Sequence, residues 1–201
     1  MTTILHQIPQ TLIRESIQES IFSEAASALW GGKSISVEGI VGSSTALAIV
    51  ALFQHGNGTI VVITPNADSA EQIAEDITLF LEPENRQNVF LVPPMVQHDH
   101  ESETALAIAD EAFGERLNIL KRLADSTDSR FVVVVSMPAL LQPAPPPALL
   151  MERTQMLTVN SCVDLQALCR LQPNECIGAS LLDYFSSSTP IVLVEPAAIK
   201  C

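Results

Sequence analysis

Residues 131–135 read FVVVV, the stretch of this chain most typical of a buried β-strand. β-Branched residues favour extended backbone, and an uninterrupted apolar run indicates a strand covered on both faces. On the N-terminal side, TIVVI (59–63) and NVFLV (88–92) repeat the pattern. Near the other end, PIVLV (190–194) repeats it once more. These runs predict the strands of a buried sheet.

Stretches with helical periodicity lie between these strands, and two weaker runs, 34–38 and 155–159, also resemble strands. Alternating strands and helices predict a parallel sheet joined by right-handed crossovers. We therefore expect an α/β fold with about five strands flanked by helices. The predicted helices cover residues 11–30, 45–54, 67–81, 113–125, 164–171 and 179–185.

The composition limits the classes of partner. Hydrophobic residues make up 47% and aromatic residues 4%, so the core is built mainly from Ala, Val, Ile and Leu. The net charge of −13 repels phosphate backbones, so we expect no direct nucleic-acid binding. The same charge would steer a basic protein partner toward the chain.

The cysteines and the termini indicate a cytoplasmic protein. The four cysteines lie in the last quarter without a CxxC pair, which favours reduced thiols over a zinc site. We find no signal peptide and no apolar run long enough to cross a membrane, so no membrane association is expected.

Residues 142–147 (QPAPPP) form the clearest boundary, because consecutive prolines favour a stiff, extended connector. We predict an α/β domain over 1–142 and a truncated small domain over 143–178. Residues 179–201 would then return a helix and a strand to the first sheet.

A Gly/Ser-rich turn between the expected strand 34–38 and the helix 45–54 has the context of a phosphate-binding loop, G-x-x-x-x-G-K-[ST]. In that loop, backbone amides surround the phosphates, the lysine neutralises them and the hydroxyl holds Mg²⁺. Gly39 occupies the first glycine position, but Ser44, Thr45 and Ala46 replace the second glycine, the lysine and the hydroxyl residue.

The turn keeps Gly42 and Ser43 but has neither the cation nor the metal ligand at the template positions. The end of the last predicted strand also lacks a metal ligand. Val194-Glu195 stands where nucleotide motors carry an acidic pair, so a valine replaces the aspartate that organises Mg²⁺. We expect a structural turn, no bound cofactor and no catalytic residue. A weak anion site at the helix N-terminus is the alternative.

Several of these segments together resemble one family. The quoted matches are GIVGSSTALAIVAL (39–52), VVITPNADSAEQIAEDITLFL (61–81), NVFLVPP (88–94), GERLNILKRL (114–123), FVVVVSMPALLQPAPPPALL (131–150), TQMLTVNSCVDLQALCRL (154–171) and LLDYFSSSTPIVLVEP (181–196). They resemble the N-terminal RecA-like module of bacterial transcription-repair coupling factor (Mfd), and more distantly the excision-nuclease component UvrB.

The resemblance implies a RecA-like, P-loop-type fold that does not bind ATP. In the family, this module recruits the excision-nuclease component UvrA and packs on other domains of the coupling factor. Here only residues 172–178 bridge segments that a long stretch separates in the family. The leading interpretation is a non-catalytic protein-interaction module in transcription-coupled nucleotide excision repair. A nucleotide hydrolase with an altered loop and a non-functional fragment are the alternatives.

Other residues are candidates for sites. Two interpretations apply to the run His98-Asp99-His100-Glu101 with Glu103 nearby. Its side chains are ligands of a metal ion, or the run is a solvated loop without bound metal. Glu115 is expected at a helix N-terminus, where an acidic side chain is favourable, and Arg116 is expected to pair with a nearby carboxylate. Contact of these residues with a partner protein is the alternative. Ser136 lacks the G-x-S-x-G context of a nucleophile. Trp30 and Tyr184 are expected to pack, because no basic residues interleave them. We therefore expect no metal site.

Overall fold

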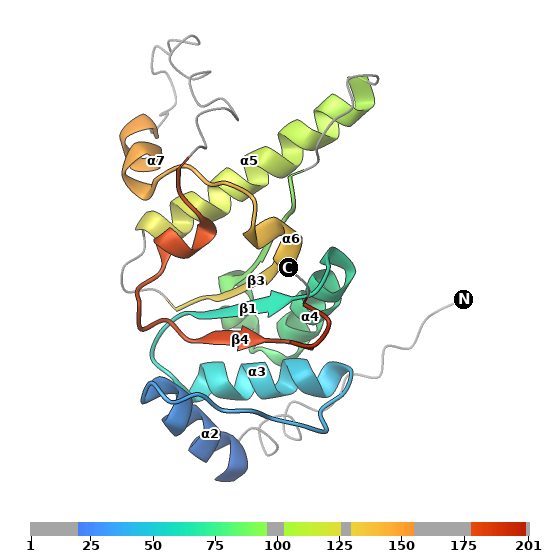
Figure 1. Ribbon diagram of the computed structural model, residues 1–201, viewed down its shortest axis with the longest axis vertical. Helices are drawn as coiled ribbons and strands as arrows, with labels where there is room; N and C mark the ends of the chain where they lie inside the picture. Colours follow the sequence, from blue (N-terminus) through green and yellow to red (C-terminus); the bar gives the residue numbers. More distant parts are fainter. Residues whose placement is uncertain (1–19, 96–102, 126–129, 155–177, 200–201) are drawn as a thin grey trace, which may run out of the picture.

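A four-stranded parallel sheet forms the centre of the fold (Figure 1). The computed structural model describes residues 20–95, 103–125, 130–154 and 178–199. The strand order is β2-β3-β1-β4, and every pairing is parallel. The strands are β1 (Ile60–Thr64), β2 (Val89–Val92), β3 (Val132–Ser136) and β4 (Ile191–Leu193).

Every residue of the two central strands, β1 and β3, is buried. Their register pairs Ile60 with Val132 and Thr64 with Ser136. A strand that is covered on both faces has no polar side to maintain, so an unbroken Val/Ile run suits it. The predictions of strands at 59–63, 88–92, 131–135 and 190–194, and of an α/β class with a parallel sheet, are confirmed. The arrangement is consistent with a RecA-like sheet.

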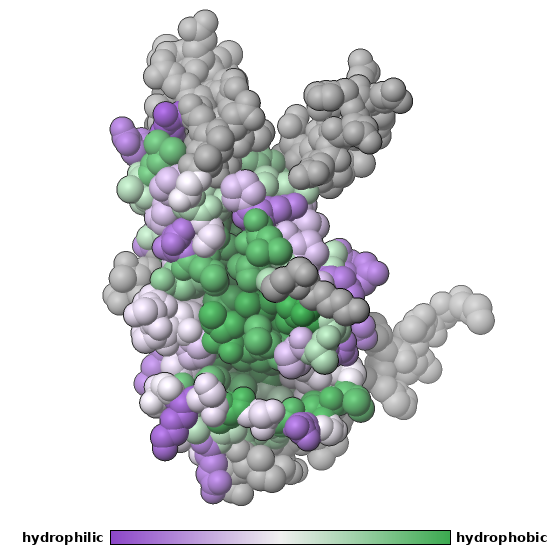
Figure 2. Space-filling view, in the orientation of Figure 1, coloured by the Kyte–Doolittle hydropathy of each residue, from purple (hydrophilic) through white to green (hydrophobic). Residues whose placement is uncertain are grey.

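Helices cover both faces of the sheet. The apolar core on one face includes residues of α2 (Ser20–Trp30), α3 (Ser43–His55) and α4 (Ala67–Phe80). The core on the other face includes residues of α5 (Glu103–Asp125), α6 (Met137–Leu140) and α7 (Pro147–Arg153). Two short 3₁₀ helices, η1 (Pro83–Asn88) and η3 (Leu181–Tyr184), complete the described elements. Figure 2 shows an apolar patch over the region where β1 and β4 lie in Figure 1.

Helix α4 shows how local sequence sets an element. The Asn66 side chain caps its first turn by accepting a hydrogen bond from the Ser69 amide at 2.8 Å. Asp68 in the first turn suits the positive end of the helix dipole. Ala70, Ile73, Ala74 and Ile77 recur at helical spacing and are buried against the sheet.

Replacing Asn66 with alanine is expected to remove this cap and to lower the free energy of unfolding by about 1 kcal/mol. For a chain of this size, that lowers Tm by roughly 2–4 °C in a thermal melt. The control is Gln72→Ala, an exposed position on the same helix, which should leave Tm nearly unchanged. Equal shifts for the two variants would contradict a specific capping role for Asn66.

The prediction of a strand at 34–38 is wrong: these residues form no strand, and the described sheet has four strands instead of about five. The physical reason is that Ile35 and Val37 are its only apolar residues and Val37 stays exposed, so pairing this run would bury little apolar surface. Residues 34–38 remain mostly exposed, with Val37 at 55% exposure and Ile35 half-buried.

Two helices differ in extent from their predictions. Helix α5 begins at Glu103, ten residues before the predicted start, because the run ETALAIAD (103–110) is rich in residues that favour helix. The predicted helix over 179–185 is only the 3₁₀ turn η3, which a capping box between Ser180 and Asp183 starts. The predictions for 11–19, 155–159 and 164–171 lie outside the described residues.

The proline connector leads directly into packed structure. Ala144 is fully buried and forms an isolated antiparallel bridge with Ala179. Leu150 of α7 is 2% exposed in the core that α5 also lines. The domain limits at 142/143 and 178/179 stay a prediction. None of the described helices is both long and apolar enough to span a bilayer.

Candidate functional site

The turn before α3 lies at the carboxyl edge of the sheet, where α/β proteins commonly bind ligands. Helix α3 ends at His55 and β1 begins at Ile60, so α3 runs back along the sheet and its amino end lies beyond the carboxyl ends of the strands (Figure 1). Gly39 and Gly42 have φ of 79° and 60°, the left-handed region that glycine adopts without strain. The two glycines therefore set the shape of the turn.

Hydrogen bonds close this turn on itself. The Ser44 hydroxyl donates to the Val41 carbonyl at 2.6 Å and accepts from the Val41 amide at 3.1 Å. The Thr45 amide donates to the Gly42 carbonyl at 3.0 Å. These contacts use groups that a phosphate-binding loop would direct at its ligand.

The side chains at the template positions do not supply the chemistry of nucleotide binding. Thr45, at the lysine position, is half-buried and neutral, and Ala46, at the hydroxyl position, is fully buried. Ser43 is exposed at the first position of α3. Because the predicted strand 34–38 does not form, the turn also lacks the strand that precedes a phosphate-binding loop.

Glu195 lies at the same edge of the sheet, two residues after the end of β4. It is exposed with φ of 50°, and its carbonyl accepts the Ala198 amide at 2.8 Å. Val194 before it packs against the apolar core. The topology thus brings the Gly39–Ala46 turn and Glu195 to one edge of the sheet, as in a nucleotide-binding site. These positions together carry one carboxylate and no cation.

The histidine and acidic run His98–Glu101 lies outside the described residues, and the side chain of Glu103 is not described either. Among the described residues, no group of three or more His, Cys, Asp or Glu side chains is placed to hold a metal ion. Metal binding by residues 98–103 stays a prediction.

Arg116 has a role that the sequence did not reveal. Its side chain is 1% exposed on α5, and its guanidinium donates to the carbonyls of Pro93 at 3.2 Å, Ala139 at 3.0 Å and Gln142 at 3.3 Å. The Gln142 side chain forms two further bonds with the Met95 backbone, at 2.6 and 2.9 Å.

Arg116 and Gln142 together join the segment after β2 to the segment after β3, again at the carboxyl edge of the sheet. The prediction that Glu115 lies at a helix N-terminus is wrong, because α5 begins at Glu103 and Glu115 is an exposed residue within the helix. The sequence signal that was available is the apolar spacing of α5, which places Arg116 on the same face as Ile119 and Leu120. Pairing of Arg116 with a carboxylate stays a prediction.

The remaining candidates serve the fold. The Ser136 hydroxyl caps α6 by accepting the Ala139 amide at 3.4 Å. The Trp30 indole donates to the Leu52 carbonyl at 3.1 Å, and the Tyr184 hydroxyl donates to the Pro145 carbonyl at 2.7 Å. These contacts agree with the expectation that Trp30 and Tyr184 are packing residues.

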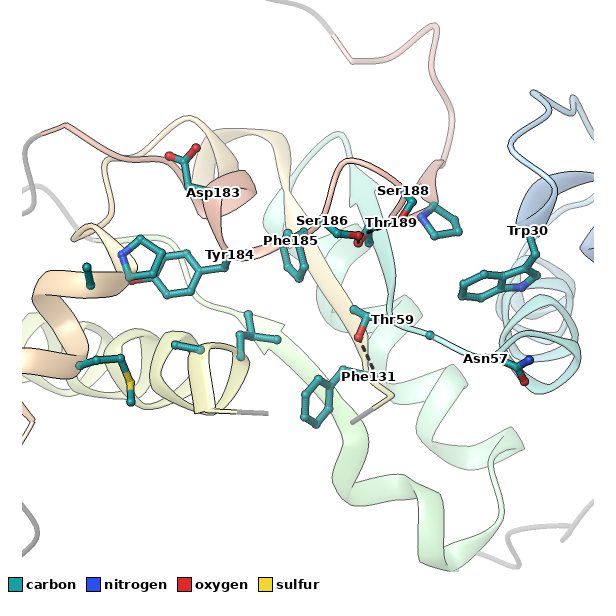
Figure 3. Close-up of a pocket in the computed structure, with 17 residues that line it drawn as sticks. Trp30, Asn57, Thr59, Phe131, Asp183, Tyr184, Phe185, Ser186, Ser188 and Thr189 are labelled. Carbon is teal, nitrogen blue, oxygen red and sulfur yellow. Dashed lines mark hydrogen bonds between the residues drawn. The ribbon is translucent and has the colours of Figure 1, made fainter. Parts of the chain in front are cut away.

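A pocket of about 630 Å³ opens at the opposite, amino edge of the sheet (Figure 3). Its lining includes Thr59, Phe131 and Pro190, which precede β1, β3 and β4. Figure 3 shows the Trp30 ring at one end of the pocket and the Tyr184 ring at the other.

Hydroxyl groups and a carboxylate in the lining of this pocket are bonded within the protein. Thr59 accepts the Phe131 amide at 3.2 Å, and the Ser186 hydroxyl lies 2.9 Å from that of Ser188. Asp183 accepts the Ser180 amide at 2.6 Å. The lining hydroxyls and carboxylate therefore already stabilise turns of the chain, which favours a structural crevice over a ligand site.

Arg130 lies beside this edge. Its guanidinium is 4.6 Å from the centre of the Phe53 ring and donates to the Phe53 carbonyl. Burial lowers the pKa of Arg130, because desolvation penalises the charged form. The contact joins the start of β3 to the end of α3 and needs no ligand.

Comparisons with models of protein families, with curated proteins and with solved structures find no match to this chain.

Proposed function

We propose that this chain is a non-catalytic protein-interaction module related to transcription-coupled nucleotide excision repair. The observation that carries the proposal is the chemistry of the turn before α3. A neutral threonine and a buried alanine occupy the positions of the lysine and the magnesium ligand, and Ser44 and Thr45 are bonded within the turn. With a net charge of −13, the protein would repel a triphosphate, and none of Ser44, Thr45 and Ala46 carries a positive charge to neutralise it.

The partner proposed from the family resemblance is the excision-nuclease component UvrA, or other domains of a coupling factor. The acidic surface supports a protein partner with basic residues and disfavours direct contact with nucleic acid. The compartment that we propose is the cytoplasm, where both partners of such a complex would meet.

Calorimetric titration with ATP and Mg²⁺ tests the non-catalytic part of the proposal. We expect no saturable heat up to millimolar ATP, with a functional P-loop ATPase as the positive control. Saturable, magnesium-dependent binding would instead support the nucleotide-hydrolase alternative. A Thr45→Lys variant belongs beside the wild type, because binding by that variant alone would show that the missing cation is the deciding defect.

Binding to purified UvrA tests the partner. We expect a complex in a pull-down with both proteins purified, and its formation should weaken as salt rises, because exposed charges are screened. If no complex forms, UvrA is not the partner, and the assignment of the fold is unaffected.

A further inference from the structure

Strand β4 lies at the edge of the sheet and has one unpaired side. It pairs with β1, and in the described part of the chain no strand pairs with its other side. The Val61 amide donates to the Pro190 carbonyl at 3.0 Å, and the Val194 amide donates to the Ile63 carbonyl at 2.9 Å. Because alternate residues of a strand direct their backbone groups to opposite sides, Ile191 and Leu193 present their amides and carbonyls to the open side.

The side chains of β4 divide in the same alternating way. Val192 and Val194 are partly buried against the core that α3 and α4 line. Ile191 is 46% exposed and Leu193 is 52% exposed, on the opposite face of the strand. An edge of this kind is a template for pairing with another chain.

Natural proteins usually protect such an edge with charges or prolines within the strand. Here Pro190 and Pro196 flank β4, and none of its three residues is charged. The prolines limit the length of the open edge but leave its donors and acceptors free of a described strand partner. The short edge therefore suits a short extended segment.

We infer that the open edge of β4 binds an extended segment of a partner protein in which apolar residues alternate with lysine or arginine. This inference rests on the proposed function, since it names where the module docks its partner and what kind of segment it takes. Main-chain hydrogen bonds to Ile191 and Leu193 supply the affinity of such strand addition, and apolar side chains on their exposed face add specificity.

Charge decides between a partner and a second copy of this chain. Two copies would bring net charges of −13 together, which opposes self-association, whereas a basic segment is attracted. Glu195, exposed two residues after the end of β4, adds a carboxylate near the end of the edge. The edge therefore favours a basic partner over a homodimer.

The test measures fluorescence anisotropy of a labelled short peptide in which valine and lysine alternate. We expect the full chain to bind it and Leu193→Pro to weaken binding at least about tenfold, because proline removes an outward-facing amide. The Leu193 amide does not bond to β1, so this variant keeps the internal ladder, and circular dichroism checks that it folds.

Matched variants separate the edge from general charge attraction. Leu193→Lys and Leu79→Lys make the same charge change at two exposed leucines, the second on α4 at 58% exposure. We expect Leu193→Lys to weaken peptide binding clearly and Leu79→Lys to change it by less than about twofold. Equal effects of the two variants would overturn the inference, as would no binding by the wild type.

Two further measurements complete the test. A peptide with glutamate in place of lysine should not bind, and equal binding of both peptides would overturn the assignment of a basic partner. Sedimentation should show a monomer, and self-association abolished by Leu193→Pro would assign the edge to a second copy instead. If the peptide does not bind but UvrA does, the inference about β4 is wrong and the proposed function is retained. Magnesium-dependent ATP binding would instead overturn the proposed function itself.

Discussion

Replacing Arg116 with alanine is expected to lower the free energy of unfolding by roughly 3–5 kcal/mol. The side chain is 1% exposed, and its removal leaves the carbonyls of Pro93, Ala139 and Gln142 without this donor in a site that water does not reach freely. A thermal or urea melt should show Tm lower by on the order of 10 °C for a chain of this size. Arg116→Lys should recover only part of the loss, since one ammonium cannot match the planar fork.

Arg122 provides the control, because it is an arginine on the same helix in an exposed position. Its guanidinium lies 4.4 Å from the centre of the Phe90 ring and donates to the Gln87 carbonyl at 3.4 Å. Arg122→Ala should cost no more than about 1 kcal/mol, as exposed cation–π contacts do. Similar losses for the two variants would show that burial of Arg116 does not stabilise the junction of the two loops.

Replacing Gly56 with alanine is expected to cost roughly 2–4 kcal/mol, because the added methyl group collides with Trp30. A Cβ at Gly56 would lie 1.8 Å from Cε2 and 2.0 Å from Nε1 of the indole. The backbone itself accepts alanine, since φ is −102° and ψ is 175°. The cost therefore arises from the displaced ring and from its hydrogen bond to the Leu52 carbonyl.

Trp30 is the single tryptophan, so its fluorescence reports the displacement directly. We expect a red-shifted emission in Gly56→Ala together with a lower Tm. On a Trp30→Ala background the Gly56→Ala substitution should have little further effect, because the collision is gone. A full additional loss in that double variant would contradict the mechanism.

Gly114 is the matched glycine control. It lies within α5, is exposed, and has no neighbour within 4 Å of the position that a Cβ would take. Gly114→Ala should therefore raise stability by about 0.5–1 kcal/mol, because alanine restricts the unfolded chain and favours helix. The same substitution thus has opposite signs at two glycines, and it is the structure that shows Trp30 filling the space beside Gly56.

Local sequence determined the identity of most elements. The Val/Ile runs that became β1 and β3 can be buried on both faces only in a covered sheet, and Asn66 with the apolar spacing after it fixes the start and face of α4. The neutral residues Thr45 and Ala46 were equally clear from the sequence, since the absence of a cation is a property of composition. Such signals lie within about ten residues of one another, where periodicity and capping act.

Tertiary structure alone decided which strands became neighbours and which side chains met. Residues 34–38 alternate as a strand would but join no strand pairing, and the strand order places β4 at an open edge. The bonds of Arg116 to Ala139 and Gln142, and the contact of Trp30 with Gly56, join residues 23 to 26 positions apart in the sequence. Such contacts depend on how the layers pack, because one volume can hold only one side chain.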